Sequence, residues 1–597
     1  MKTLFLLLPL LLCLEDLPDL KQETLEWKVP KNSVLEYDVF EGKSKKPAET
    51  DLFFFTSEFH NKNSNRIAMY RYADLPWHFL FQLPKEGIKR GSRWVHTAHF
   101  FHESSFAAGL WSWRGPTTIR PLQGTARYTV KKLKDGIATI EASVLFYEIK
   151  RDSANNQMRL KVTKNKIGTL ATAAEFDIAK GMVVRGGYNL YLMRGQQRVY
   201  EKEEWKVRDK KIKTTQRIEL SEIVPLDPKK MEKAIEAGKK RAMTWLKRKQ
   251  SKGGDFGTDR TLETSQVESN LTGLVVESLI SAGMDPEDPV IKKALDSIEG
   301  NPGPGTPQSY RNAIVAMIRP WITNWQSIED IRKTLPTDLP AKTKQAIASA
   351  TRALLNLQDS DSGAWAPGRK RRTNSPNSVT NYHAIEGLFY AWLAGEKFPD
   401  RIRDPLLDWY SKKEVEEDQN VKLEFDFAEG ISPIMEDPGT VSPSTWPSAF
   451  QSRSSNSPFN TGTSRGTAIS VLAALESLAL LRAQSNLDPS RKKSVNRMIL
   501  RGLGWLQYLW TLRTPPPTEA SWSMRQMEYL LLLMRVMTAY GIEKIDGSDW
   551  FLEGAYLLLR NQFQDGSWDQ SGGRDIQDTA AGLLFLSRGA LKLSPSR

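Results

Sequence analysis

One structural unit recurs through the last part of the 597-residue chain. In each copy a helical segment ends in a glutamine, a polar turn with a glycine follows, and an aromatic residue leads to a second helix of small and apolar residues. The clearest copy spans 550–588 and contains Gln564-Asp565-Gly566-Ser567-Trp568. Since one such unit cannot bury its apolar face alone, neighbouring units must stack on one another. The recurrence therefore predicts an array of paired helices.

Three weaker copies precede this one. The copy at 350–393 has Gln358 and Trp365, and the copy at 234–282 has Gln250 and Phe256, whereas 501–540 keeps two helices without the turn. The glutamine side chain can bridge backbone groups at the end of the first helix. The glycine takes a positive φ without strain, and the aromatic side chain buries on the order of 150–250 Å². Such an array curves and can close into a ring.

The segment Gln564–Trp568 resembles the QW motif of the squalene/hopene cyclases, and the array is similar to the repeats of protein prenyltransferase β subunits. The resemblance covers the C-terminal part of the chain, 227–597. It implies a terpenoid cyclase-like α/α toroid, with an aromatic-lined central cavity that opens towards one end. A fold of this kind hosts many functions, so the resemblance alone does not imply catalysis.

Residues 23–226 have a different pattern. Alternating β-branched and aromatic segments predict strands at 34–40, 51–55, 127–131, 137–147 and 187–193, and Lys134-Asp135-Gly136, Lys180-Gly181 and Arg185-Gly186-Gly187 predict turns. The break at Pro225-Leu226-Asp227-Pro228 separates this part from the helices. We expect an N-terminal all-β sandwich or half-barrel followed by the α/α toroid.

The first 22 residues are typical of an export signal. Lys2 precedes an apolar run from Leu4 to Leu14, which is too short to span a bilayer. Lipidation at Cys13 is not expected, because Leu12 occupies the position where a lipoprotein signal has a small residue. The sequence therefore predicts an exported protein of the periplasm or cell envelope.

Cys13 is the only cysteine, so neither a disulfide nor a Cys-ligated metal is expected in the exported chain. The prenyltransferase resemblance implies a zinc ion held by Asp, Cys and His, and the missing cysteine excludes that activity.

His96, His99 and His102 are three residues apart. On a helix they would share a face and could bind a metal, but their aromatic neighbours suit a strand or turn. We predict no metal and no cofactor.

The resemblance to the cyclases also bears on catalysis. Those enzymes protonate an alkene with an aspartate in an Asp-x-Asp-Asp-Thr-Ala motif, and this chain has Asp575-Ile576-Gln577-Asp578-Thr579-Ala580. Gln577 occupies the position of the proton donor, and an amide cannot serve as that acid. Asp578, with Asp575 nearby, is the candidate replacement. Alternatively, Asp578 is the N-cap of the following helix, which stabilises a helix by roughly 0.5–2 kcal/mol.

Further candidates are expected to face the toroid cavity. His383, with Glu386 one helical turn later, could act as an acid/base pair or bind a ligand, or it could simply pack beside Tyr382. The candidate catalytic residues are therefore Asp578, Asp575 and His383. The candidate ligand-binding residues are Tyr310 (followed by Arg311), Tyr382, Glu386, Trp392 and Trp568.

Two classes of function remain open. The first is an exported binding or scaffolding protein whose partner is an apolar lipid, a glycan or a protein, without the catalysis implied by the resemblance. The alternative is a divergent terpenoid cyclase-like enzyme, or a polysaccharide lyase or hydrolase, that acts in the toroid cavity.

The net charge of +14 and basic clusters such as 239–241, 247–249 and 369–372 predict solvated faces, with peripheral contact to anionic lipid as the alternative. No nucleic-acid module accompanies them, so nucleic acid is not an expected partner.

Overall fold

The chain separates into two compact units that divide between Val224 and Pro225. The computed structural model describes residues 33–41, 49–54, 83–84, 87–100, 114–119, 122–152, 159–201, 204–260, 268–300, 305–322, 328–360, 362–366, 376–416, 420–428, 439–446, 468–484, 487–508, 526–545, 547–569 and 575–590, and the isolated residues 25, 28, 44, 47, 510, 512 and 593. The expected export signal at 1–22 lies outside these residues. None of the described helices is long and apolar enough to cross a membrane.

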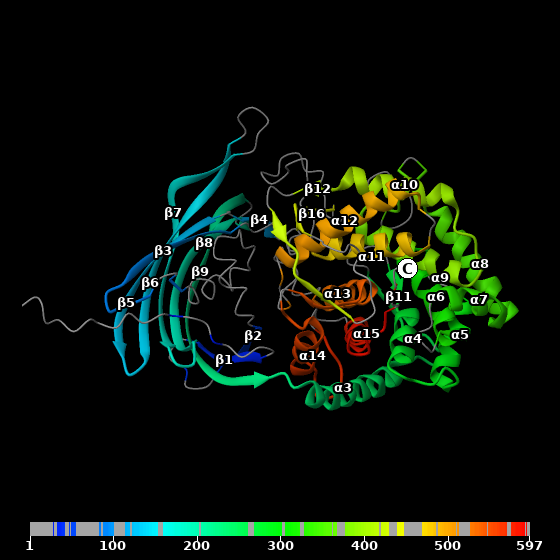
Figure 1. Cartoon of the computed structure of the whole chain (residues 1–597), viewed down its shortest axis with the longest axis horizontal. Helices are drawn as coiled ribbons and strands as arrows, with labels where there is room; N and C mark the ends of the chain where they lie inside the picture. The colour runs from blue at the N-terminus through cyan, green and yellow to red at the C-terminus, as the bar shows by residue number, and fades with distance from the viewer. Residues whose placement is uncertain are drawn as a thin grey trace, which may run out of the picture. The chain divides into compact units, whose positions relative to one another are not determined.

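The N-terminal unit is an antiparallel sheet whose long strands bend along their length (Figure 1). The strand order is β2-β1-β9-β8-β7-β6-β5-β3, and β4 pairs with β8. The strands are β1 (Ser33–Glu41), β2 (Glu49–Phe54), β3 (Arg93–Phe100), β4 (Arg114–Ile119), β5 (Leu122–Lys134), β6 (Ile137–Asp152), β7 (Arg159–Asp177), β8 (Met182–Glu201) and β9 (Glu204–Pro225). The nine described strands form one hydrogen-bonded sheet rather than the two sheets of a sandwich.

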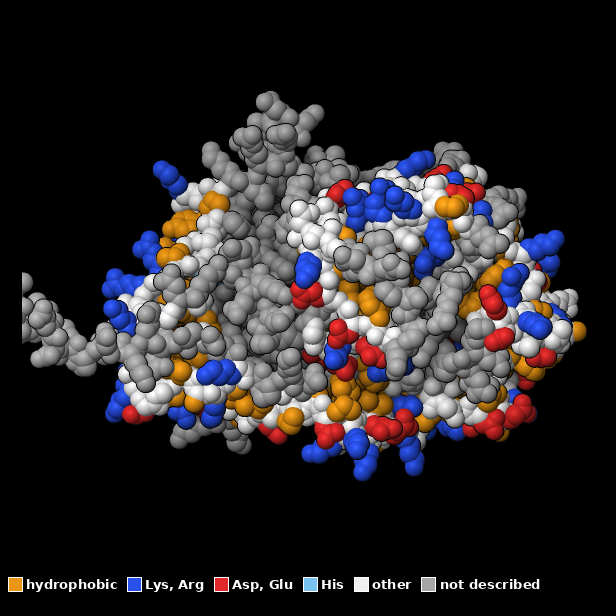
Figure 2. Space-filling view, viewed as in Figure 1, with side chains coloured by type: hydrophobic (Ala, Val, Ile, Leu, Met, Phe, Trp, Pro, Cys, Tyr) orange, Lys and Arg blue, Asp and Glu red, His pale blue; other side chains and the backbone are white. Residues whose placement is uncertain are grey.

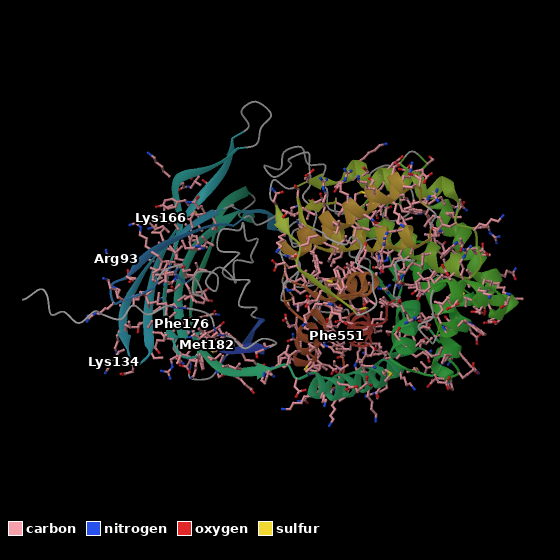
Figure 3. The ribbon with its side chains drawn as sticks, viewed as in Figure 1. Arg93, Lys134, Lys166, Phe176, Met182 and Phe551 are labelled. Carbon is pink, nitrogen blue, oxygen red and sulfur yellow. The ribbon has the colours of Figure 1, made fainter. Side chains whose placement is uncertain are left out.

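Alternation of side chains gives this sheet one apolar face. Ala126, Tyr128 and Val130 of β5 are buried, whereas the intervening Arg127 is exposed. Phe176 and Met182 lie at the same end of the sheet and are also buried (Figure 3). The predicted polar and apolar alternation of the strands is therefore present.

The predicted turns have mixed outcomes. Asp135 and Gly136 both have positive φ, 52° and 74°, as a two-residue hairpin between β5 and β6 requires. Gly181 also has a positive φ, 63°, directly before β8. The turn expected at Arg185-Gly186-Gly187 is wrong, because these residues lie inside β8 and pair with both β7 and β9. A Cβ at Gly187 would lie 3.2 Å from the carbonyl oxygen of Gln216, so close approach of the neighbouring strand accounts for this glycine.

The C-terminal unit is a closed ring of paired helices. Its inner helices are α4 (Thr272–Ser281), α6 (Pro307–Ile318), α9 (Ser378–Leu393), α11 (Ala468–Gln484), α13 (Gln526–Tyr540) and α15 (Asp575–Leu586). Each packs against the next in this order, and α15 packs against α4. The remaining helices are α3 (Pro228–Lys249), α5 (Pro289–Gly300), α7 (Ile328–Asp338), α8 (Ala341–Asn356), α10 (Asp400–Lys413), α12 (Pro489–Tyr508) and α14 (Trp550–Arg560), and each packs on at least one inner helix. The expected α/α toroid is therefore present.

Burial explains why the helices divide into two rings. In α11 the side chains from Ala468 to Leu481 are all buried, as an apolar helix surrounded by others requires. In α3 only one face is buried, with Ile235, Ala242 and Leu246, while Lys and Arg side chains cover the other.

In the clearest copy a glutamine side chain bridges backbone groups as predicted, but the glutamine is Gln562 and not Gln564. The side-chain amide of Gln562 donates to the carbonyl oxygens of Gly566 (2.9 Å) and Gly238 (3.0 Å), whereas Gln564 is exposed. Trp568 is fully buried and its indole donates to the carbonyl oxygen of Leu558 at 2.8 Å. This turn therefore connects the end of α14 to its own loop and to α3.

The same contacts recur in the second copy. Gln358 donates to the carbonyl oxygen of Gly363 at 2.7 Å, and the indole of Trp365 donates to the carbonyl oxygen of Leu354 at 2.9 Å. The pair α10/α11, which the repeat pattern did not reveal, also has a buried tryptophan, Trp446, whose indole donates to the carbonyl oxygen of Tyr410 at 2.9 Å.

The basic clusters of α3 are held by ion pairs on the surface of the helical unit. Lys239 lies 2.7 Å from Glu236, Lys247 lies 2.7 Å from Asp288, and Lys249 lies 3.0 Å from Asp575. Figure 2 shows acidic and basic side chains interspersed along this unit. This supports the prediction of solvated faces for these lysines.

Candidate ligand pocket

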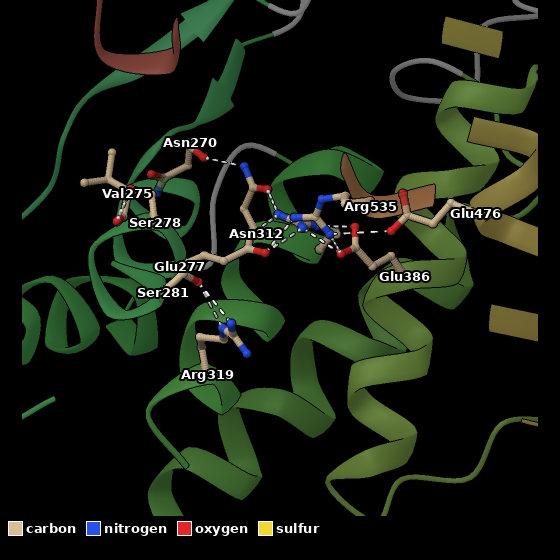
Figure 4. Close-up of polar contacts among 11 residues, drawn as sticks. Asn270, Val275, Glu277, Ser278, Ser281, Asn312, Arg319, Glu386, Glu476 and Arg535 are labelled. Carbon is tan, nitrogen blue, oxygen red and sulfur yellow. Dashed lines mark hydrogen bonds and ion pairs between the residues drawn. The ribbon is translucent and has the colours of Figure 1, made fainter. Parts of the chain in front are cut away.

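Five ionisable side chains from five different inner helices meet in the middle of the ring. They are Glu277 of α4, Arg311 of α6, Glu386 of α9, Glu476 of α11 and Arg535 of α13, and all are buried. Figure 4 labels the three glutamates and Arg535. We call these five residues the axis cluster. Because charges are removed from water only when they are paired, the cluster is a strong constraint on how the inner helices are positioned.

The guanidinium of Arg311 donates all its N–H bonds to Glu277, Glu386 and Asn312. Nε and Nη2 donate to the two carboxylate oxygens of Glu386, both at 2.7 Å. Nη1 and Nη2 donate to the two oxygens of Glu277 at 2.8 and 3.3 Å, and Nη1 also donates to Oδ1 of Asn312 at 3.0 Å. A guanidinium has five N–H bonds, so none remains for a ligand.

Arg535, on α13, contacts the same two carboxylates as Arg311 does. Its Nη2 donates to Glu277 at 2.6 Å, its Nη1 donates to Glu386, and the same Nη1 lies 3.6 Å from Glu476. Burial alone would raise the pKa of Glu386, but Arg311 and Arg535 more than offset it and hold that pKa below its usual range. Glu386 is therefore ionised.

Glu476 is in the opposite state. Burial, together with the neighbouring carboxylate of Glu386, raises its pKa well above the usual value, and Arg535 only partly offsets this. With Glu476 protonated, the two arginines are balanced by the two carboxylates of Glu277 and Glu386, and the axis cluster carries no net charge.

A pocket lies against one side of this cluster. The pocket is small, and much of the surrounding space of about 610 Å³ is open solvent; its lining comes from the first two turns of five inner helices. The apolar side chains are Leu274, Met527, Leu531, Leu532 and Ala581, and the polar ones are Gln308, Arg311, Asn312, Tyr382, His383, Glu528, Gln577 and Asp578. Among the described lining residues Tyr382 and His383 are the only aromatic rings, so this is not the aromatic-lined cavity expected from the resemblance.

Three of the predicted site residues lie in this pocket. Asp578 is buried and lines it, but α15 begins at Asp575, so Asp578 lies within the first turn rather than capping the helix. Tyr382 and His383 line it with their rings 4.8 Å apart. Gln577, which replaces the proton donor of the cyclase motif, also lines it.

The other predicted site residues lie elsewhere. Asp575 is half-exposed and paired with Lys249, and Glu386 belongs to the axis cluster. Trp392 packs under the guanidinium of Arg332, whose Cζ lies 4.2 Å from the ring centre. Trp568 belongs to the repeat turn, and Tyr310 is not among the pocket-lining residues.

His383 is neutral at physiological pH. Burial, and next the positive charge of Arg311, lower its pKa to about 3. Its Nδ1 is buried and has no hydrogen-bond partner among the described residues. The imidazole therefore brings hydrogen-bonding capacity but no positive charge to the pocket.

The histidines of the N-terminal unit do not form a described metal site. His96 lies on β3 and is buried, which lowers its pKa to about 4. His60, His78 and His102, and the side chain of His99, lie outside the described residues. No group of three or more His, Cys, Asp or Glu side chains that could hold a metal occurs in the described part of the chain.

Glu277, Glu476 and Arg535 were missed by sequence reasoning. A signal for them exists, because each is a single charge in the middle of an apolar helix, as in Leu274-Val275-Val276-Glu277-Ser278-Leu279-Ile280. Such a charge must be paired when the helix is buried.

No protein-family model and no curated protein matches the chain. Among solved structures it is similar to the GH76A α-1,6-mannanase from Salegentibacter sp. HEL1_6, at 12% identity and a TM-score of 0.39, with 60% of this chain and 98% of that chain covered. It is also similar to a variant of the type II terpene cyclase MstE from Scytonema in complex with geranylgeranyl dihydroxybenzoate, at 10% identity and a TM-score of 0.34, with 60% and 98% covered. At these values neither likeness assigns an activity.

Proposed function

We propose that this chain is an exported binding protein whose toroid holds a short neutral glycan in the pocket beside the axis cluster. The observation that carries the proposal is the set of polar side chains in the lining, Gln308, Asn312, Gln577, Tyr382 and His383, which lie within a larger apolar surface. Amide, phenol and imidazole groups suit ligand hydroxyls, which both donate and accept hydrogen bonds.

The axis cluster argues against a long apolar ligand. A polyisoprenoid chain needs a deep apolar cavity, because each buried methylene contributes about 0.8 kcal/mol only when it leaves water for an apolar environment. Here Arg311 lines the pocket, and the charged groups of Glu277 and Glu386 lie directly behind it. A ligand of limited depth with a polar surface fits this pocket better.

An array of neutral gluco-, manno- and galacto-trisaccharides tests the proposal. We expect at least one neutral trisaccharide to bind the full chain, and Gln577→Trp to abolish this binding by filling the pocket. Gln564→Trp is the matched control, because Gln564 is exposed on the repeat turn and does not line the pocket. Binding that persists in Gln577→Trp, or the absence of binding to any trisaccharide, would show the proposal to be wrong. Extraction of a co-purifying isoprenoid would favour a lipid ligand instead.

A second candidate function is glycan cleavage. It is favoured by one observation, namely that Glu528 and Asp578 both line the pocket. Glycoside hydrolysis requires two carboxyl groups on opposite sides of the scissile bond, one as acid and one as base or nucleophile. New reducing ends released from a bound trisaccharide, and their loss in both Glu528→Gln and Asp578→Asn, would establish an enzyme. A trisaccharide recovered intact after prolonged incubation favours the binding protein.

Export is the remaining part of the proposal, and it is supported by the apolar run that ends at Leu14. N-terminal sequencing of the protein recovered from a host cell envelope tests it. We expect the first 22 residues or so to be absent. Recovery of the uncleaved chain in the cytoplasm alone would contradict export without affecting the pocket.

A further inference from the structure

The outer face of the N-terminal sheet is defined by its strand register. Residues paired across neighbouring antiparallel strands point to the same side of a sheet. Three such rows run across β3, β5, β6, β7, β8 and β9, and we call them the outer face. The first row is Arg93, Thr129, Glu141, Ala173, Gly187 and Arg217, the second is Val95, Arg127, Ser143, Ala171, Asn189 and Thr215, and the third is Thr97, Thr125, Leu145, Thr169, Tyr191 and Lys213. Every member is exposed or half-buried, whereas Tyr128, Ala142 and Tyr188, which lie between the first two rows, are buried.

This face carries more positive than negative charge. Its basic members are all exposed, and they are Arg93, Arg127, Lys213 and Arg217. Glu141 is the only acidic member, and its carboxylate lies 3.4 Å from Nζ of Lys131. Arg217 lies 3.5 Å from Glu219, whereas the other three basic members make no ion pair within the described part of the chain. Figure 2 shows mainly Lys and Arg among the charged side chains at the visible edge of this unit. The outer face therefore attracts anions.

The middle of the outer face has short side chains with polar groups among them. Ser143, Ala171 and Asn189 lie there, on β6, β7 and β8, and all three are exposed. Tyr191 is 42% exposed and is paired with Lys213 on β9, so an aromatic ring and a cation lie side by side. Hydroxyl and amide groups bind sugar hydroxyls, an exposed ring packs against the apolar side of a sugar, and a cation pairs with a carboxylate. The outer face offers all three kinds of group.

A lipid surface fits this face less well. Binding to a membrane surface scales with the apolar area that enters it as well as with charge. Ser143, Ala171 and Ala173 in the middle of the face are too short to enter a headgroup layer, so only the charges would contribute there.

We propose that the outer face binds an acidic polysaccharide, whose carboxylates pair with Arg93, Arg127 and Lys213. Six strands about 4.8 Å apart make the face roughly 24 Å wide, so it fits a chain of several sugars rather than a single one. This binding is independent of the pocket, because all of its residues lie in the other unit of the chain.

Polygalacturonate and its methyl ester test the proposal, because they are the same polymer with and without free carboxylates. We expect the full chain to bind polygalacturonate at physiological salt, and to bind the methyl ester at least about tenfold more weakly. Binding to polygalacturonate should disappear in about 1 M salt, where the Debye length is only about 3 Å.

Two pairs of substitutions separate the outer face from the overall charge. Arg127→Glu combined with Lys213→Glu should weaken binding of polygalacturonate roughly tenfold or more, because two attractions become repulsions. Lys492→Glu combined with Lys493→Glu, on the exposed side of α12, changes the net charge equally and is the control, which should weaken binding less than about twofold. Tyr191→Ala leaves the charge unchanged and should weaken binding severalfold through the lost ring contact. Circular dichroism identifies a variant that fails to fold, in which case Tyr191→Ala and the methyl ester decide.

Several results would overturn the inference. No binding to polygalacturonate, or equal binding to its methyl ester, would show that the outer face does not recognise carboxylates. Equal losses in the two pairs of substitutions would leave only attraction by the net charge of +14. Unchanged binding in Tyr191→Ala, or tighter binding to phosphatidylglycerol vesicles that is lost with Arg127→Glu and Lys213→Glu, would mean that the face recognises charge alone, as on a lipid surface. None of these results affects trisaccharide binding in the pocket, which is measured separately.

Discussion

Arg311 and Glu386 join two neighbouring inner helices through two parallel hydrogen bonds of 2.7 Å, from Nε to Oε2 and from Nη2 to Oε1. This two-point geometry fixes both the distance and the orientation of the pair. Since Arg311 also lines the pocket, the same contact that positions α6 against α9 gives the pocket a rigid wall.

Arg311→Met should destabilise the chain strongly. The substitution leaves Glu277 and Glu386 buried with only Arg535 to balance them, and removing one partner from a buried ion pair costs about 3–5 kcal/mol. Urea unfolding measures the loss. Arg248→Met on the exposed face of α3 is the control and should change the free energy of unfolding by less than about 0.5 kcal/mol. Similar effects of the two substitutions would show that the axis cluster contributes little.

Substitution by glutamine should have a large effect on stability at Glu386 and a small effect at Glu476. Glu386 is ionised beside two arginines, so Glu386→Gln should lower the free energy of unfolding at pH 7 by several kcal/mol, about 3–5. Glu476 is held protonated by burial, and a glutamine has nearly the same shape and charge as a protonated glutamate. Glu476→Gln should therefore change stability by less than about 1 kcal/mol.

Chemical denaturation of both variants at pH 7 checks this pair of predictions. A large loss of stability in Glu476→Gln would mean that its carboxylate is ionised in the folded protein. The axis cluster would then carry a net negative charge.

The ring could be predicted from the sequence because its repeats depend on local chemistry. The turn glycine, the buried Trp568 and the small-residue helices each have a local cause, so they recur and can be recognised. The pair α10/α11 was missed because its tryptophan, Trp446, follows a long connection after α10 rather than a short turn. The axis cluster was missed because its pairing joins helices far apart in sequence, and only ring closure brings them together.

The pocket was predicted only in part, and the helical period explains which part. His383 and Tyr382 lie near the start of α9 and reach the pocket. Trp392 is nine residues after His383, which is about 13 Å along a helix axis, so it cannot reach the same end of the ring. Glu386 is one turn deeper than His383, which places it in the axis cluster behind the wall of the pocket.

Gly566→Ala should reveal how closely the repeat turn approaches α3. Gly566 has a φ of 97°, and a Cβ there would lie 2.5 Å from the carbonyl oxygen of Arg241. Both backbone strain and the clash should lower stability, by roughly 2–4 kcal/mol together. Gly257→Ala is the control, because Gly257 has a φ of 79° but no atom within 4 Å of the added Cβ, so it should cost only about 1 kcal/mol. Equal losses of stability in the two variants, measured by thermal unfolding, would rule out the clash.

The free energy of unfolding should decrease as the pH rises, because the carboxyl group of Glu553 on α14 is buried. This carboxyl is buried and accepts a hydrogen bond from Ser548 at 2.6 Å, and burial raises its pKa to about 8. Below pH 4.5 the group is protonated in both the folded and the unfolded chain. Between pH 4.5 and about 8 the unfolded chain releases this proton while the folded chain keeps it, so the free energy of unfolding decreases. Above pH 8 both states have released the proton, and the free energy of unfolding falls no further because of this group.

Glu553→Gln should remove this dependence, because its amide stays neutral and its carbonyl oxygen can still accept from Ser548. Relative to the parent chain, the variant should gain stability as the pH rises from 4.5 to 8, by up to roughly 5 kcal/mol. Glu543→Gln on the exposed side of β17 (Ile542–Ile545) is the control and should follow the parent at every pH. Urea unfolding at half-unit pH intervals makes the comparison. A difference between Glu553→Gln and the parent chain that does not change with pH would mean that Glu553 has the same pKa in the folded and the unfolded chain.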